Sequence, residues 1–303
     1  MAISFGALFY LVKIIDFSNV AAHLTSRAVA ILLPALIVYG VFSLAVEALT
    51  LRRLLHTTRA DFTLITAARI KAASYLLTLV HYAIGAAALT VLLRRRAGAG
   101  LAESAGVVML IMMFDLAMVL SMVVVGASLV SSTNIQLQFG LILGIIAVIA
   151  GGLALLRAPV SLGPLDRLRE LELFQAARTI AKRDLVELAL LRLVFVLGFE
   201  LLGWTALYAF EFEVPFGAVM VNFSAVALVS MLPAIGGLGP SQVAMVEFFR
   251  AYGTAESLLA CSIALSSGMI VLRSLIGIVF AGEFSREAYS AVLDVEATSE
   301  GES

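Results

Sequence analysis

Long apolar blocks dominate this sequence, and they constrain its fold more than any other feature. A transmembrane helix needs about 20 apolar residues to cross a hydrocarbon core of about 30 Å. Blocks of that kind run at about 28–50, 104–128, 134–156, 186–210 and 257–282. Only 14% of the 303 residues are charged, whereas soluble domains carry roughly 25% charged residues. The sequence therefore predicts an all-α, polytopic transmembrane helical bundle.

Three further apolar stretches do not fit a simple span. The opening stretch, ISFGALFYLV, is short and is followed by Lys13 and Asp16. Since no small-residue cleavage site follows it, we interpret it as a short first span and not as a cleaved signal. The regions at about 72–93 and 214–251 are apolar but interrupted. We therefore expect about six spans plus two segments of another kind.

The distribution of Lys and Arg predicts the orientation of the spans, because cytoplasmic loops are enriched in basic residues. Basic residues gather at 52–71, 94–96 and 157–183, whereas the SSTN turn at 131–134 has none and EFEVP at 211–215 is acidic. We therefore place the basic stretches and both termini on the cytoplasmic side of the cytoplasmic (inner) membrane.

That orientation makes each interrupted region a re-entrant hairpin. The segment between Lys71 and Arg94 has cytoplasmic residues at both ends, and the segment 216–252 begins and ends outside. Residues 82–104 and 233–257 also share the letters AIG and AES at similar spacing. Hairpins that enter from opposite faces are typical of inverted-repeat transporters, which handle substrate near the midplane.

The repeat divides the chain into two halves. We expect a single membrane domain, residues 1–285, with a first half-repeat at about 28–156 and a second at about 186–282. Residues 286–303 are expected to form a polar cytoplasmic tail.

The stretch SMLPAIGGLGPSQ at 230–242 would interrupt any helix that contained it. Gly236 and Gly237 allow a turn without a Cβ clash, and Pro240 suits the first turn of a following helix with Gly239 or Ser241 near its cap. The free N–H groups of that helix would attract a phosphate or carboxylate. Alternatively, the glycines only allow close helix packing and the prolines only kink the helices.

The stretch MLPAIGGLGPSQVAMVEFFRAYG resembles the signature of the lysylphosphatidylglycerol synthase transmembrane-region family, also called flippase-like integral membrane proteins. The residues that match the family pattern are Pro233, Gly236, Gly237, Leu238, Gly239 and Gly253. The earlier stretch ARIKAASYLLTLVHYAIGAAALTVLLRRRAG, with Asp115 beyond it, is similar to the first conserved hairpin of the family. The resemblance covers about residues 5–285 and implies movement of lipids, often aminoacylated or glycosylated, between leaflets.

The chain departs from the family pattern at two places. Ser241 and Gln242 replace the usual Arg-Glu pair, and His81-Tyr82 stands where the first hairpin usually carries a proline. A neutral tip could still bind a headgroup through backbone N–H groups, but Gln242 cannot carry a proton.

Ionisable residues inside the spans are the other functional signal, because each costs about 2.5–3.5 kcal/mol at a helix centre. Asp115 and Arg273 lie mid-span and could be partners, Glu200 lies deep in its span, and Glu247 and Arg250 share a helix face. The alternative is a set of interhelical pairs that fix packing. The candidate substrate-binding residues are therefore His81, Asp115, Glu200, Pro233, Gly236, Gly237, Gly239, Ser241, Gln242, Glu247, Arg250 and Arg273. We interpret Glu47 as an interface residue whose side chain reaches toward the cytoplasm.

The sequence lacks the motifs of an intramembrane enzyme. There is no HExxH motif, no DDxxD motif and no Walker motif, and no histidine follows Ser241. The three histidines are scattered, and the single Cys261 excludes a thiolate metal site. We predict no enzyme activity, no catalytic residue, no metal and no cofactor.

These observations favour a flippase-like protein that moves a lipid or a lipid-linked headgroup between leaflets. The alternatives are a small-molecule secondary transporter and a non-transporting membrane partner of a lipid-modifying enzyme. The expected partners are membrane lipids, with a lipid-modifying enzyme and a homo-oligomer left open. A net charge of −1 gives no sign of a nucleic-acid partner.

Overall fold

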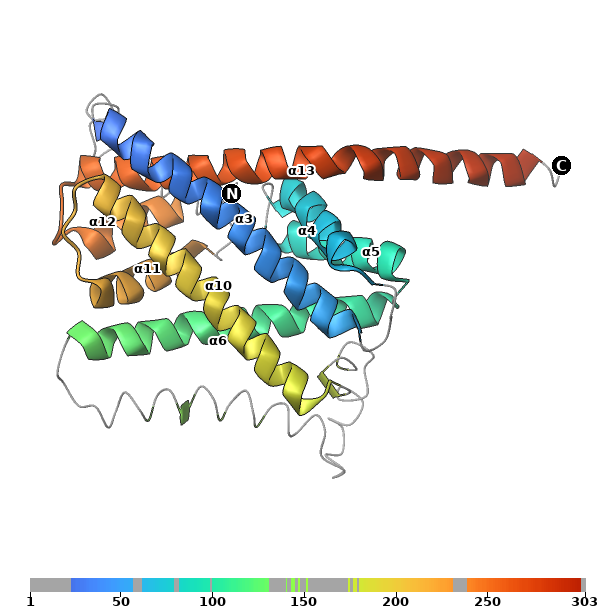
Figure 1. Ribbon diagram of the computed structural model, residues 1–303, viewed down its shortest axis with the longest axis horizontal. Coiled ribbons are helices and arrows are strands. Elements are labelled where there is room, and N and C mark those ends of the chain that lie inside the picture. The colour runs from blue at the N-terminus through green and yellow to red at the C-terminus, as the bar shows by residue number, and fades with distance from the viewer. Residues whose placement is uncertain are drawn as a thin grey trace.

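The computed structural model shows an all-helical membrane bundle (Figure 1). It describes residues 23–56, 62–78, 82–98, 100–130, 180–230 and 239–300, with isolated residues between 140 and 178. These residues form the helices α3 (Ser26–His56), α4 (Leu64–Thr78), α5 (Tyr82–Ala97), α6 (Leu101–Val130), α10 (Lys182–Ala209), α11 (Phe216–Ser230), α12 (Pro240–Phe249) and α13 (Ala255–Glu300). No strand occurs among them, so the predicted all-α class is confirmed.

Three of the helices are long and apolar enough to cross a membrane: Ser26–Leu55 in α3, Leu101–Val130, and Ala255–Phe280 in α13. Each contains one of the predicted spans. The 28 residues of α10 extend over about 42 Å, and they carry Arg192 and Glu200 between apolar residues. The expected spans at 3–17 and 134–156 lie outside the described residues, apart from isolated positions in the second.

Threonine caps begin three of the helices. The backbone N–H of Ala28 donates to Thr25 Oγ1, that of Thr66 to Thr63 Oγ1, and that of Ser257 to Thr254 Oγ1. Such a cap supplies an acceptor to one of the N–H groups that a helix start leaves without a partner.

The C-terminal helix continues past its membrane span. The apolar part of α13 ends at Phe280, close to the expected 282, and the helix continues to Glu300 and extends beyond the rest of the bundle in Figure 1. Residues 283–300 contain neither glycine nor proline, and Glu, Ala, Leu and Arg are good helix formers. The local sequence therefore continues the helix.

The long helices form a crossed bundle. In Figure 1, α3 and α10 run side by side, with α6 along one edge and α13 along the other. Exposed apolar side chains follow the outward faces, as Leu33, Ile37 and Val41 do on α3 and Leu275 and Val279 do on α13. Spacings of about four residues place such side chains on one helix face, which suits contact with lipid.

Two pairs of short helices lie at opposite ends of the bundle (Figure 1). The pair α4–α5 lies where α3 ends and α6 begins, and α11–α12 lies where α10 ends and α13 begins. Separate helices flank each predicted interruption: α4 ends at Thr78 and α5 starts at Tyr82, and α11 ends at Ser230 and α12 starts at Pro240. Residues 79–81 and 231–238 lie outside the described residues. Pro240 is the first residue of its helix, as predicted.

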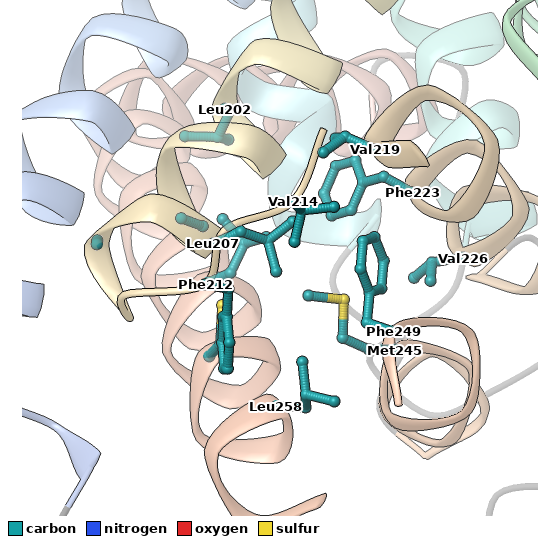
Figure 2. Close-up of a cluster of buried hydrophobic side chains, with 14 of the residues drawn as sticks. Leu202, Leu207, Phe212, Val214, Val219, Phe223, Val226, Met245, Phe249 and Leu258 are labelled. Atoms are coloured by element: carbon teal, nitrogen blue, oxygen red, sulfur yellow. The ribbon is translucent and has the colours of Figure 1, made fainter. Parts of the chain in front are cut away.

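Each pair of short helices is anchored by its own apolar cluster. Figure 2 shows the cluster at the α11–α12 end, where Phe223, Phe249 and Leu258 meet from α11, α12 and α13. A second cluster joins Leu51 of α3 with Ile70 and Leu93 of the α4–α5 pair. The space between the two clusters holds the polar side chains described next.

Candidate functional site

A cavity of about 260 Å³ lies in the interior of the bundle. Helices α3, α4, α5, α6, α10, α11 and α13 all contribute to its wall. Its polar lining residues are Tyr39, Glu47, Lys71, Ser74, Tyr75, Thr78, Asp115, Ser230 and Arg273. Since charged groups within membrane helices are costly and mark functional sites by default, this cavity is the candidate functional site.

Glu47 is held inside the cavity by two side chains of α4. Lys71 Nζ lies 3.1 Å from Glu47 Oε1, and the Tyr75 hydroxyl donates to Glu47 Oε2 at 2.9 Å. Only 12% of the Glu47 side chain is exposed. Our interpretation of Glu47 as a residue reaching toward the cytoplasm was therefore wrong. The physical reason is that α4 brings a cation and a hydroxyl to the carboxylate, and these contacts offset the cost of burying its charge away from water.

Asp115 also finds its partner on another helix. Arg192 Nη1 of α10 lies 3.5 Å from Asp115 Oδ1, while Arg192 Nη2 donates to Thr50 Oγ1 of α3 at 2.5 Å. The expected partnership of Asp115 with Arg273 was wrong, because the crossing of α6 and α10 places Arg192 next to the carboxylate. The sequence analysis did not single out Arg192, although an arginine within an apolar span is the signal that would have found it.

Arg273 lines the same cavity without an ion pair among the described residues. Its guanidinium carbon lies 5.3 Å from the centre of the Tyr75 ring, a distance typical of a cation–π contact. The buried Arg273 Nε and the buried Tyr39 hydroxyl find no hydrogen-bond partner in the described part of the chain. Both residues line the cavity, so it has donor capacity that the described protein groups leave unused.

Positive charge exceeds negative charge around the cavity. Lys71, Arg192 and Arg273 supply three cations, and Glu47 and Asp115 supply two carboxylates. Within each ion pair the cation neutralises the carboxylate, so the positive charge of Arg273 remains. The cavity can therefore take a polar group that bears a negative charge.

Glu200 lies outside this cavity, at the contact between α10 and α11. It is 1% exposed, and Ser224 Oγ donates to its Oε1 at 2.5 Å. The sequence predicts Glu200 deep in its span; the structure buries it between helices but does not bring it into the wall of the cavity.

The start of α12, which is the described part of the expected hairpin tip, uses its polar groups internally. Gly239, at φ 107°, precedes α12, and its N–H donates to Gln242 Oε1 at 2.5 Å. Ser241 Oγ donates to the same oxygen at 3.1 Å, and Gln242 Nε2 donates to Ser266 Oγ of α13 at 3.3 Å. Gln242 thus closes the start of its own helix and joins it to α13. Pro233, Gly236, Gly237 and His81 lie outside the described residues.

Glu247 and Arg250 share one face of α12, as predicted. The two groups are 3.8 Å apart, and their side chains are 41% and 78% exposed. Neither residue lines the cavity. An exposed pair of this kind contributes little to stability.

No group of three or more His, Cys, Asp or Glu side chains that could hold a metal ion occurs in the described ranges. Cys261 is buried in the apolar cluster of Figure 2. The cavity instead combines paired charges, a cation–π contact and apolar walls.

Helices long and apolar enough to span a bilayer, with ionisable side chains gathered in the interior, define a polytopic helical membrane protein. The model of the lysylphosphatidylglycerol synthase TM region family matches residues 1–277, and the chain belongs to that family. The resemblance noted in the sequence is thereby confirmed. Searches of curated proteins and of solved structures gave no match.

Proposed function

We propose that this protein moves a lipid, or a lipid-linked headgroup, between the leaflets of the cytoplasmic membrane. The observation that carries the proposal is the interior cavity, with its two ion pairs and the arginine that has no counter-ion in the described structure. A headgroup that crosses a bilayer must leave water, and a charged cavity replaces part of its hydration. Membership of the family supports the same proposal.

The two pairs of short helices are the basis for the alternating-access mechanism that we propose. We propose that α4–α5 and α11–α12 are re-entrant hairpins of an inverted repeat, which enter the membrane from opposite faces. Their positions at opposite ends of the bundle support this, as does the placing of the cavity where residues of both hairpins meet, with Thr78 and Ala86 on one side and Ser230 on the other. Substrate sites of inverted-repeat transporters lie at such repeat interfaces.

Transport of lipid can be tested in liposomes that contain the purified chain. Fluorescently labelled phosphatidylglycerol in the inner leaflet becomes accessible to dithionite only after it has moved outward. The test variant is Glu47→Gln with Lys71→Gln, which removes both charges of this ion pair together and leaves neither buried without its partner. We expect wild-type liposomes to move the lipid and the double variant to fall to the rate of protein-free liposomes.

The matched control is Glu187→Gln on α10. Glu187 lies outside the cavity, near Arg53 and Arg183 on the surface, so this variant should keep the wild-type rate. The proposal would be contradicted if the double variant, folded by its thermal midpoint, transported as fast as the control.

A small-molecule secondary transporter is the second candidate, and the size of the cavity favours it. About 260 Å³ accommodates a headgroup or a small solute but no acyl chains. A lipid carrier must therefore open sideways so that the chains stay in the bilayer. Native mass spectrometry separates the two candidates: a phospholipid that stays bound to wild type and is lost from the double variant supports lipid transport. Retention of a small polar solute without lipid would favour the second candidate.

A further inference from the structure

A further buried acidic group, Glu200, lies outside the cavity. Glu200 and Ser224 face each other across the contact of α10 and α11, and both are almost completely buried. The Ser224 hydroxyl donates to Glu200 Oε1, but Glu200 Oε2 has no hydrogen-bond partner among the described residues. Only one of the two oxygens of this carboxyl group therefore has a hydrogen-bond donor.

No cation in the described part of the chain forms an ion pair with this carboxyl group. The interior titratable residues of the helices packed on α10 are Tyr39 and Glu47 of α3, Asp115 of α6, and Cys261 and Arg273 of α13, while α11 has none. Four of these line the cavity, and Cys261 lies in the apolar cluster at the α11–α12 end. Among the described residues, its one hydrogen bond comes from Ser224, and its second oxygen has no partner. A bound proton removes the charge and so offsets the cost of burial.

The pair lies one helical turn from the cavity on both helices. Val196, four residues before Glu200, lines the cavity, and so does Ala227, three residues after Ser224. The rings of Phe199 and Phe223, which lie beside the pair in sequence, are 4.8 Å apart between centroids. A small separation of α10 and α11 would therefore join Glu200 to the water of the cavity.

We propose that Glu200 is a proton-binding site that couples transport to proton movement across the membrane. The proposal rests on the transport function proposed above. When α11 moves away from α10, Glu200 Oε2 forms an O–H bond with a proton donated by a hydronium ion in the cavity, which becomes water. After access changes to the other membrane face, that O–H bond breaks and the proton returns to water there. Chains of buried carboxylates act in this way in membrane pumps and transporters.

The test measures proton flux and lipid movement separately, with the full chain in liposomes. Pyranine trapped inside the liposomes reports proton entry driven by a potassium diffusion potential with valinomycin. Glu200→Gln keeps an oxygen for the Ser224 hydrogen bond but binds no proton. We expect this variant to reduce proton entry to the level of protein-free liposomes, while Glu187→Gln, the same substitution at a half-buried position of α10 outside the cavity, leaves proton entry unchanged.

Infrared spectroscopy gives a readout that does not require transport. The C=O band of a protonated, buried carboxyl group should be present in wild type and absent in Glu200→Gln at equal thermal midpoint. Proton entry that is the same in Glu200→Gln and wild type, no proton entry in wild type, or a band that the substitution leaves unchanged would each overturn the proposal. Proton entry that depends on Glu200 without dithionite-detected lipid movement would instead overturn lipid transport alone.

Discussion

At the residue scale, the interior is organised by charges whose partners come from other helices. Glu47 and Lys71 join α3 to α4, and Asp115 and Arg192 join α6 to α10. Removing one partner of a buried pair is costly because it leaves an uncompensated charge, whereas removing both together can be nearly neutral. The stability of the folded protein should therefore fall when either member of a pair is removed alone.

Lys71→Gln should destabilise the protein by about 3–5 kcal/mol, because it leaves the carboxylate of Glu47 without its cation. The double variant with Glu47→Gln should lose clearly less than the sum of the two single variants. Unfolding in detergent with increasing denaturant measures all three changes. Simple additivity would show that the two groups do not interact in the folded protein.

Gln242→Ala should cost about 1–3 kcal/mol, because the buried N–H of Gly239 loses its acceptor. Gln242→Glu is the matched control, since its carboxylate oxygen can still accept from Gly239 while the donation to Ser266 is lost. Thermal midpoints in detergent compare the two variants. Equal midpoints for Gln242→Ala and wild type would contradict the capping role.

At the scale of elements, glycines allow the closest helix contacts. The contact of α6 with α11 brings Gly126 against Gly217: a Cβ at Gly126 would lie 2.7 Å from the carbonyl oxygen of Gly217 and 2.7 Å from Met220 Cβ. Small residues at such crossings let two backbones approach and gain packing within the membrane. The contact also fixes α11 at the wall of the cavity, which Ala227 and Ser230 line.

Gly126→Leu should separate α6 from α11 and lower the thermal midpoint, because the neighbouring backbone cannot move aside as a flexible side chain would. Overpacking of this kind costs typically about 1–3 kcal/mol. Gly100→Ala, whose Cβ would be 3.9 Å from the nearest atom, Glu103 Cβ, is the control and should leave the midpoint unchanged. A similar thermal midpoint in both variants would mean that the contact of α6 with α11 accommodates the larger side chain without loss of stability.

The whole molecule has two distinct ends, and the two helix pairs lie at opposite ones. Arg95→Cys near the end of α5 and Thr254→Cys before α13 should therefore react with a membrane-impermeant maleimide from opposite sides of the membrane. The native Cys261 is fully buried, so it should give only a low background. Labelling of both positions from one side would contradict the orientation predicted from the basic stretches.

The sequence by itself determined the helical class and the breaks, because both depend on local properties. Apolar blocks of sufficient length must form helices in lipid, since every backbone group needs an internal partner. Pro240 suits the first turn of a helix because it has no N–H group to leave without a partner, and α12 begins at this residue. The family motif could be recognised from the sequence because its residues lie close together along the chain.

Only the tertiary structure decided which buried charges meet. Glu47 and Asp115 lie on different helices, and their cations come from α4 and α10, at positions 71 and 192 of the chain. Helix crossings determine these contacts, and periodicity within one helix does not reveal what lies opposite. For that reason the sequence placed Glu47 at the interface, paired Asp115 with Arg273 and overlooked Arg192, while the cavity that collects these groups became visible only in the packed bundle.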